Sequence, residues 1–155
     1  MNYKLFRKQL YEDVATNNSF GEKVAEVKQE LKNGAGPKDV FDVVEDFSDG
    51  LAVVKLGDKY NFINNDGELL RENMWFNDVT WFNEGLAEVE LNGKWNFINT
   101  NGEIVFDDLW FDFVRDFQDG FAKVYLGDEW YYLDTKGNLY DEDENLINNI
   151  TENRQ

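Results

Sequence analysis

The 155-residue sequence contains no cysteine and no histidine. It therefore lacks the usual ligands of structural zinc and of haem, and it lacks the base of every catalytic triad that uses histidine. No stretch reaches the roughly 18 apolar residues that a membrane span needs, and no basic start followed by an apolar run marks a signal peptide. We expect one soluble, cytoplasmic domain that carries no cofactor and no metal.

Positive charge is scarce, because 15 Lys and Arg residues stand against 32 Asp and Glu residues, giving a net charge of −17. The excess of acid is concentrated in residues 41–140, where 21 acidic residues face 7 basic ones. A field of this sign repels nucleic-acid phosphates and anionic lipids, so we expect no direct binding to nucleic acid or membrane. It attracts basic protein surfaces. A second interpretation is that the acidity serves only solubility.

Residues 1–39 have the pattern of a helical cap. Apolar side chains at near-helical spacing predict a first helix over about residues 3–16. A capping-box pattern from Ser19 to Glu22 opens a second helix, predicted over about residues 20–33, which ends at an Asn-Gly pair. We expect this segment to cover the first of the repeats that follow.

From residue 40 onward the sequence repeats a unit of 35 residues three times, as residues 40–74, 75–109 and 110–140. The most regular pattern is Phe-x-acid-Gly, which starts at Phe47, Phe82 and Phe117. A second set of positions is aromatic in every copy: Tyr60, Trp95 and Trp130. Agreement at a fixed step indicates a repeat architecture, and the shared aromatic residues are expected in its core.

Each unit has the pattern of a β-meander. In the middle copy, residues 86–91 alternate between apolar and acidic side chains, which predicts a strand with one buried and one solvated face. Asn92-Gly93 suits a type I′ turn into a returning strand. Because one hairpin cannot bury its aromatic face alone, the units must stack or curl together. We predict a mainly β fold of three hairpin repeats, forming a stacked array or a barrel-like sheet, followed by an acidic C-terminal tail at residues 141–155.

Several segments of the middle copy match a known pattern: Gly85-Leu86-Ala87, Asn-Gly-Lys-Trp-Asn-Phe-Ile-Asn at residues 92–99, and Trp110-Phe111-Asp112. On these segments the chain resembles the WG repeat, also called the KWG repeat. The glycine of the Trp-Gly pair is replaced in the three copies by Asn61, Asn96 and Tyr131. The resemblance implies a β-rich scaffold for interactions, and it implies no reaction and no catalytic residue.

Three aromatic residues, Trp81, Tyr125 and Tyr131, stand where sister copies hold polar or charged side chains. A position that accepts a polar residue in one copy is expected to be exposed in the others. We therefore predict these three as aromatic anchors for a partner. Local packing against the cap or the tail is the alternative interpretation. The acidic candidates for a negative stripe are Asp107, Asp108, Asp112 and Asp116.

The first hypothesis is a non-catalytic acidic module that docks a basic protein, in one version a phage- or mobile-element-encoded inhibitor that imitates nucleic acid. An alternative is a carbohydrate-binding protein with Trp81 and Tyr131 as stacking platforms. A weaker alternative is a glycosidase built on a carboxylate pair such as Asp116 and Asp119. An open array has free edge strands, so a homodimer is also expected as an option.

Overall fold

A computed structural model describes residues 18–107 and 109–147. The first expected helix, at about residues 3–16, and Asp108 lie outside the described residues. Within the described part, two helices precede three antiparallel sheets: α2 (Asn18–Lys32) and α3 (Pro37–Val40); β1 (Val43–Val44), β2 (Leu51–Leu56) and β3 (Lys59–Asn64); β4 (Asp78–Val79), β5 (Leu86–Leu91) and β6 (Lys94–Asn99); β7 (Phe113–Val114), β8 (Phe121–Leu126), β9 (Glu129–Asp134) and β10 (Leu139–Tyr140). We call these sheets 1, 2 and 3 in chain order.

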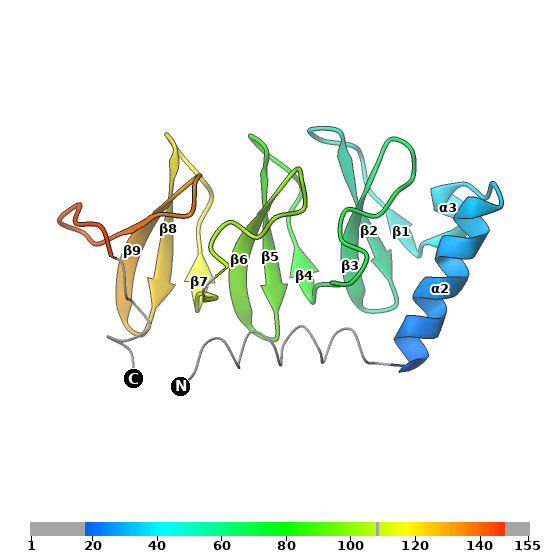
Figure 1. Cartoon of the computed structure of the whole chain (residues 1–155), viewed down its shortest axis with the longest axis horizontal. Coiled ribbons are helices and arrows are strands. Elements are labelled where there is room, and N and C mark those ends of the chain that lie inside the picture. Colours follow the sequence, from blue (N-terminus) through cyan, green and yellow to red (C-terminus); the bar gives the residue numbers. More distant parts are fainter. Residues whose placement is uncertain (1–17, 108, 148–155) are drawn as a thin grey trace.

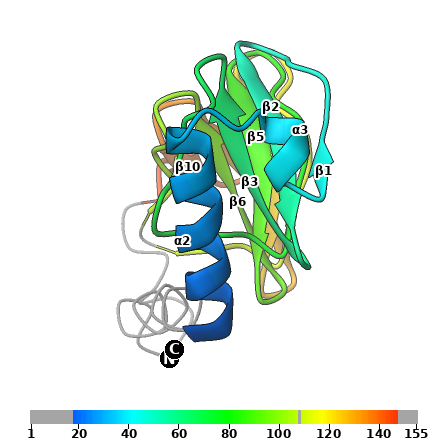
Figure 2. The same cartoon turned by 90° about the vertical axis from the view of Figure 1, so that its right-hand side faces the viewer.

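The three sheets are stacked side by side along the long axis of the molecule, with α2 at one end (Figure 1). Seen along that axis, the sheets lie behind one another and α2 lies across the first (Figure 2). Each sheet is a separate unit, in the orders β1-β2-β3, β4-β5-β6 and β10-β9-β8-β7. The fold is therefore a repeat array. The alternative, a barrel-like sheet, is not formed by the described residues.

The repeated sequence pattern gives repeated backbone geometry. In the three copies of Phe-x-acid-Gly, the acidic residues Asp49, Glu84 and Asp119 have φ values of 55°, 54° and 54°. The glycines that follow them have φ values of 79°, 81° and 86°. Non-glycine residues rarely take a positive φ, so this agreement shows that the same turn is formed three times. The Asn92-Gly93 turn also has two positive φ values, 50° and 86°, as a type I′ turn requires.

Alternate side chains of one strand pack against different neighbours in sheets 1 and 2. On β2, Val53 packs toward sheet 2, whereas Val54 packs toward α2, and both are buried. Both faces of β2 are therefore covered, whereas residues 86–91 of β5, for which the sequence predicts one buried and one solvated face, alternate between half-buried and buried. Stacking covers a sheet on both sides, and only an outermost sheet can keep an open face.

Two of the three repeated phenylalanines insert into the preceding repeat. Phe82 meets Phe62 edge-on with ring centroids 4.8 Å apart, and Phe117 meets Phe97 in the same way at 4.6 Å. Phe47 belongs to the first repeat and has no preceding sheet to enter. It is 48% exposed, so the expectation that Phe47 lies in the core is wrong.

The helical cap covers sheet 1 as predicted. Val27 of α2 is buried against the face of sheet 1 that points away from sheet 2. The ring of Phe20 meets that of Trp75 edge-on, with ring centroids 5.2 Å apart. Neither described helix has the length and apolar character to cross a membrane.

Candidate interaction surface

A row of carboxylates runs along the stack on the loops that lead from the first to the second strand of each sheet. We call this row the acidic edge; its members are Asp46, Asp49, Glu84, Asp116 and Asp119, and all are exposed. Direct contacts hold the first two loops together: Ser48 Oγ donates to the carbonyl oxygen of Phe82 (2.6 Å), and the Gly85 amide donates to Asp49 Oδ2 (2.8 Å). Stacked sheets lie about 10 Å apart, so each loop advances the row by about that distance.

Trp81 occupies the position in repeat 2 that aspartates occupy in repeats 1 and 3. Its side chain is 65% exposed, which confirms the prediction of an exposed aromatic residue here. Trp81 lines a groove of about 270 Å³ between sheets 2 and 3, together with Glu88, Asp116 and Phe117. An aromatic anchor and a member of the acidic edge therefore share one groove.

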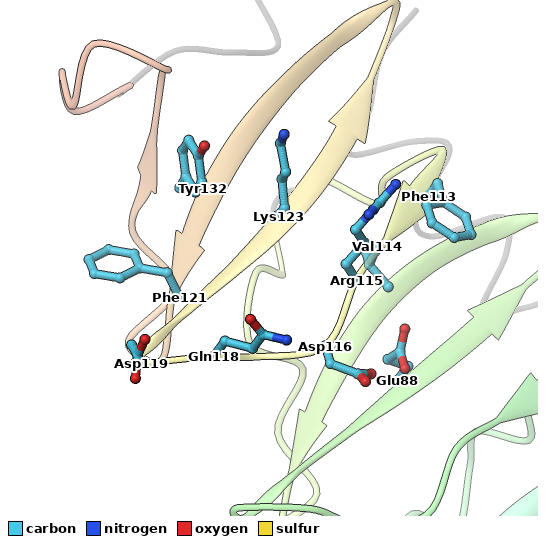
Figure 3. A pocket seen from close by; sticks show the side chains of 10 residues that line it. All are labelled: Glu88, Phe113, Val114, Arg115, Asp116, Gln118, Asp119, Phe121, Lys123 and Tyr132. Carbon is cyan, nitrogen blue, oxygen red and sulfur yellow. The ribbon is translucent and has the colours of Figure 1, made fainter.

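A larger groove of about 740 Å³ continues from this place along β7 and β8 (Figure 3). Glu88 and Asp116 line both grooves. The figure shows their side chains close together although they come from different sheets. The other lining residues are Phe113, Val114, Arg115, Gln118, Asp119, Phe121, Lys123 and Tyr132. Glu88 and Asp116 lie at the junction of sheets 2 and 3, whereas the aromatic and basic members of the groove lie on the face of sheet 3 that points away from sheet 2.

The pKa of Glu88 is raised to about 8. Burial is the main cause, followed by a side-chain hydrogen bond with Asp116 and by the negative charges of Asp116 and Asp78. Because the partly buried side chain cannot be solvated fully, the neutral form is favoured and Glu88 holds its proton at pH 7. A protonated Glu88 can donate to the Asp116 carboxylate, and this sharing lets two acids meet at one junction.

Tyr125 lies away from Trp81, on the outward surface of sheet 3. It is half-buried, and its ring lies 4.8 Å from that of Trp130. Trp130 also receives two cations: Lys123 Nζ lies 5.1 Å and the Arg115 guanidinium 5.2 Å from its ring. Tyr125 is therefore part of a different surface from the acidic edge.

Tyr131 is only 7% exposed, so the prediction that it is an exposed anchor is wrong. It points into the core between sheets 2 and 3, and its hydroxyl donates to Glu129 Oε2 (2.7 Å). The prediction assumed that a position with a polar residue in the sister copies is exposed. The sister residues, Asn61 and Asn96, are themselves buried.

The buried asparagines bind the loop that follows each hairpin. Asn96 Nδ2 donates to the carbonyl oxygens of Phe106 (2.8 Å) and Leu109 (3.2 Å), and Asn96 Oδ1 accepts the amide of Phe97 (2.8 Å). Asn61 makes the corresponding bonds in repeat 1. A polar residue at this position therefore indicates a satisfied hydrogen-bond network rather than exposure.

The three predicted acidic residues that the structure describes, Asp107, Asp112 and Asp116, do not form one stripe. Asp112 accepts the amide of Gly127 through Oδ2 (2.8 Å) and forms an ion pair with Lys94, so its carboxylate stabilises a turn. Asp107 is exposed but lies on the loop between β6 and β7, and Asp108 is outside the described residues. Only Asp116 belongs to the acidic edge.

Sequence reasoning did not single out Glu84 or Phe121, and it noted Phe113 only as an aromatic residue where the sister copies hold Val43 and Asp78. The signal was present in the 35-residue step, which places Glu84 in line with Asp49 and Asp119.

The three stacked sheets, joined by equivalent turns, define the molecule as a β-repeat protein whose units associate face to face. The family model described as "WG containing repeat" matches residues 40–60, 76–95 and 97–130. The chain is therefore a WG repeat protein with three repeats. Comparison with curated proteins and comparison with solved structures returned no match. Among the residues that the structure describes, no group of three or more acidic side chains is arranged to hold a metal ion.

Proposed function

We propose that the protein is a non-catalytic, cytoplasmic interaction module that docks a basic protein along the acidic edge. The observation that carries this proposal is the threefold repetition of one turn, which presents Asp49, Glu84 and Asp119 in the same backbone conformation. Carboxylates held on rigid turns lose little conformational freedom when they bind, so a partner gains more from each contact.

Trp81 supplies the apolar part of the same surface. Tryptophan is one of the residue types that are enriched at the energetic centre of an interface. Its neighbours in the row are Asp46 and Asp116, so a fitting partner presents Lys or Arg side chains around an apolar or planar group. Rim charges of this kind mainly accelerate association and suppress wrong partners.

Proteins that bind nucleic acid carry such basic surfaces, and a row of negative charges along a narrow edge is suited to occupying them. The inhibitory version of the proposal is therefore that this chain blocks a nucleic-acid-binding protein. In that version, the chain competes with DNA or RNA for the partner, and a gel-shift titration of the captured partner measures the competition.

The test is a pull-down from host lysate with three immobilised proteins. The first is the wild type. The second carries Asp46→Asn, Glu84→Gln and Asp119→Asn, which neutralise the acidic edge. The third carries Glu72→Gln, Asp107→Asn and Glu142→Gln, which remove the same charge from exposed positions on the other loops. Capture of a basic protein should fall strongly for the second protein only.

Salt dependence supplies the second criterion. Capture by the wild type should weaken by at least about tenfold between about 50 and about 500 mM NaCl, because exposed charges are screened over that range. Equal capture by both triple variants, or capture that ignores salt, would remove the proposal.

A carbohydrate ligand is the second candidate, and the exposed Trp81 ring beside the groove favours it. The second predicted platform, Tyr131, is buried. A titration of tryptophan fluorescence with a panel of oligosaccharides should stay flat for the wild type if the protein interaction is correct. A glycosidase is not favoured by the Glu88–Asp116 pair, since hydrogen-bonded carboxyls leave no space for a glycosidic bond between them.

A further inference from the structure

The smaller groove between sheets 2 and 3 combines an exposed tryptophan with a pair of carboxyl groups. It is lined by Trp81 from the loop before β5, by Glu88 of β5 and by Asp116 from the loop before β8. Small-molecule sites in proteins usually have about 300–1,000 Å³, so a groove of about 270 Å³ is suited to one side chain of a partner. Among the described residues that line this groove, none is Lys or Arg. The groove therefore carries negative charge and no cation of its own.

The ring of Trp81 is open to contact by such a side chain. It is 65% exposed, and no other ring or cation of the described chain is packed on it. Trp130 is the opposite case, because the Arg115 guanidinium lies 5.2 Å and Lys123 Nζ 5.1 Å from the centroid of its ring. Tryptophan attracts cations more strongly than the other aromatic residues do. Trp81 can therefore make with a partner the contact that Trp130 makes inside the chain.

Asp116 supplies the negative charge of the groove. Its side chain is exposed, forms no ion pair within the described part of the chain, and shares a hydrogen bond with Glu88. Figure 3 shows the two side chains close together although they come from neighbouring sheets. A carboxylate that accepts one hydrogen bond keeps lone pairs for further donors, and a guanidinium presents two parallel N–H groups to it. Asp116 can therefore pair with an arginine while it keeps its contact with Glu88.

The carboxyl pair is a property of the second junction. One repeat earlier, Glu88 and Asp116 are replaced by Val53 and Trp81. Neither of these side chains can carry a negative charge. Of the two junctions that the structure describes, only the one between sheets 2 and 3 can therefore bind a cation in this way.

We propose that this groove receives an arginine side chain of the basic partner, whose guanidinium stacks on Trp81 and pairs with the Asp116 carboxylate. The inference rests on the proposed function, because it names the group that the partner inserts at the acidic edge. Arginine is favoured over lysine because its planar, weakly hydrated head group stacks on an indole ring and pairs with a carboxylate through two hydrogen bonds. The ammonium group of lysine is compact and holds its water more strongly.

Glu88 couples the groove to pH. Its pKa is raised to about 8, first by burial, then by a hydrogen bond with Asp116 and by the charges of Asp116 and Asp78. Arg115 and Lys123 line the larger groove together with it. A guanidinium beside the carboxyl pair stabilises the ionised form of Glu88, so binding lowers its pKa and releases a proton. By linkage, the groove should bind arginine more tightly when the pH rises above about 8.

A titration of the full chain with three short peptides tests the proposal. They are Gly-Gly-Arg-Gly-Gly with blocked termini and its counterparts with lysine or citrulline at the centre. The chain has five tryptophans, and the indole N–H signal of Trp81 is the one missing from the NMR spectrum of Trp81→Ala. The arginine peptide should shift this signal and bind about two- to fivefold more tightly than the lysine peptide. The citrulline peptide, which has a similar shape and no charge, should not shift it.

Two variants and two matched controls locate the binding. Asp116→Asn and Trp81→Ala should each raise the Kd of the arginine peptide at least about fivefold, followed at the backbone amide of Phe117. Asp58→Asn removes the same charge from the exposed turn between β2 and β3, and Phe47→Ala removes an exposed ring from the first repeat. Each control should change the Kd by less than about twofold, because neither residue lines the groove and distant exposed charges are screened.

A pH series tests the part played by Glu88. The Kd of the arginine peptide should fall at least about threefold between about pH 6.5 and about pH 9 for the wild type. It should stay constant for Glu88→Gln, which cannot ionise. Arginine keeps its charge over this range, so the change reports on the protein. An unchanged Kd for the wild type would overturn the role of Glu88 in the groove.

The proposal is overturned if the arginine peptide leaves the Trp81 signal unmoved up to about 20 mM, or if citrulline binds as well as arginine does. Equal effects of Asp116→Asn and Asp58→Asn would also overturn it. These results leave the proposed function standing if capture still depends on the acidic edge, since the triple variant used there leaves the groove residues unchanged. Conversely, a groove that binds arginine, together with capture that ignores the acidic edge, would remove the proposed function alone.

Discussion

The two junctions of the stack have the same architecture and different chemistry. In the preceding repeat the equivalent of Glu88 is Val53, which is buried at the first junction, and the equivalent of Asp116 is Trp81, whose exposed ring lines the groove between sheets 2 and 3. At the second junction, Glu88 and Asp116 share a hydrogen bond. The scaffold needs the inserted phenylalanine at each junction, but it tolerates either an apolar or an acidic neighbour. The acidic choice makes the second junction sensitive to pH.

The largest expected loss of stability is common to both junctions. Phe82→Ala and Phe117→Ala should each lower the free energy of unfolding by about 3–5 kcal/mol, because each removes a ring buried in the preceding repeat. Phe47→Ala should cost well under about 1 kcal/mol, since its ring enters no preceding sheet. Urea denaturation followed by circular dichroism measures all three. Equal costs at the three positions would contradict the stacking.

A smaller loss of stability is expected when the loop that follows each hairpin loses its hydrogen bonds to the buried asparagine. Asn96→Ala should cost about 1–3 kcal/mol, because it leaves the buried carbonyl groups of Phe106 and Leu109 without their donor. Asn61→Ala should cost a similar amount at the first junction. Thermal unfolding of the two variants makes the comparison. A negligible change in either would show that its amide does not hold the loop.

The stability of the second junction, unlike that of the first, is expected to depend on the ionisation of Glu88. The pKa of Glu88 is raised from 4.5 to about 8, so the folded chain keeps a proton that the unfolded chain releases. The contribution of Glu88 to stability is therefore complete below pH 4.5 and is lost as the pH rises through about 8. Glu88→Gln should remove this part of the pH dependence, so the variant should exceed the wild type in stability at pH 9.

The matched control for that experiment is Glu90→Gln on the same strand. The pKa of Glu90 is also raised, by partial burial and by Asp78, but this side chain has no carboxyl partner across the junction. Glu90→Gln should reduce the pH dependence of the free energy of unfolding less than Glu88→Gln does. Identical profiles for wild type and Glu88→Gln between pH 4.5 and pH 9 would show that the pair does not exist in solution.

The smallest effect on stability is expected at Trp81. Trp81→Ala should change the free energy of unfolding by less than about 0.5 kcal/mol, because the side chain is mostly exposed. The same substitution should reduce capture of the basic partner. A large loss of stability would mean that Trp81 serves the junction rather than a partner.

The sequence was sufficient for features that depend on one repeat alone. The 35-residue step, the Asn92-Gly93 turn and the Phe-x-acid-Gly turns are local, because their glycines and positive φ values need no neighbour. The second helix was also predictable from its own apolar stripe, since the side that packs on sheet 1 recurs at helical spacing.

The burial of the other residues depends on which element packs against each face of a sheet. The sequence of a single repeat does not contain that information. Phe47 has the same sequence context as Phe82, yet only Phe82 has a preceding sheet to enter. Tyr131 and Asn96 are both buried at the same position because the two strands share an inward direction there, whatever their polarity. The exposure of Phe121 could not be read from composition, since it differs from the buried Leu51 only in that no further sheet of the described chain covers it.

Equivalent turns follow one another along the stack and so align the acidic edge. Because the chain has no cysteine, the double variant Asp49→Cys/Asp119→Cys can carry two spin labels at unique sites. Two sheet spacings separate these positions, and double electron–electron resonance should give one narrow distance distribution near about 20 Å. A broad distribution, or a mean beyond about 35 Å, would contradict the stacked arrangement and with it the acidic edge.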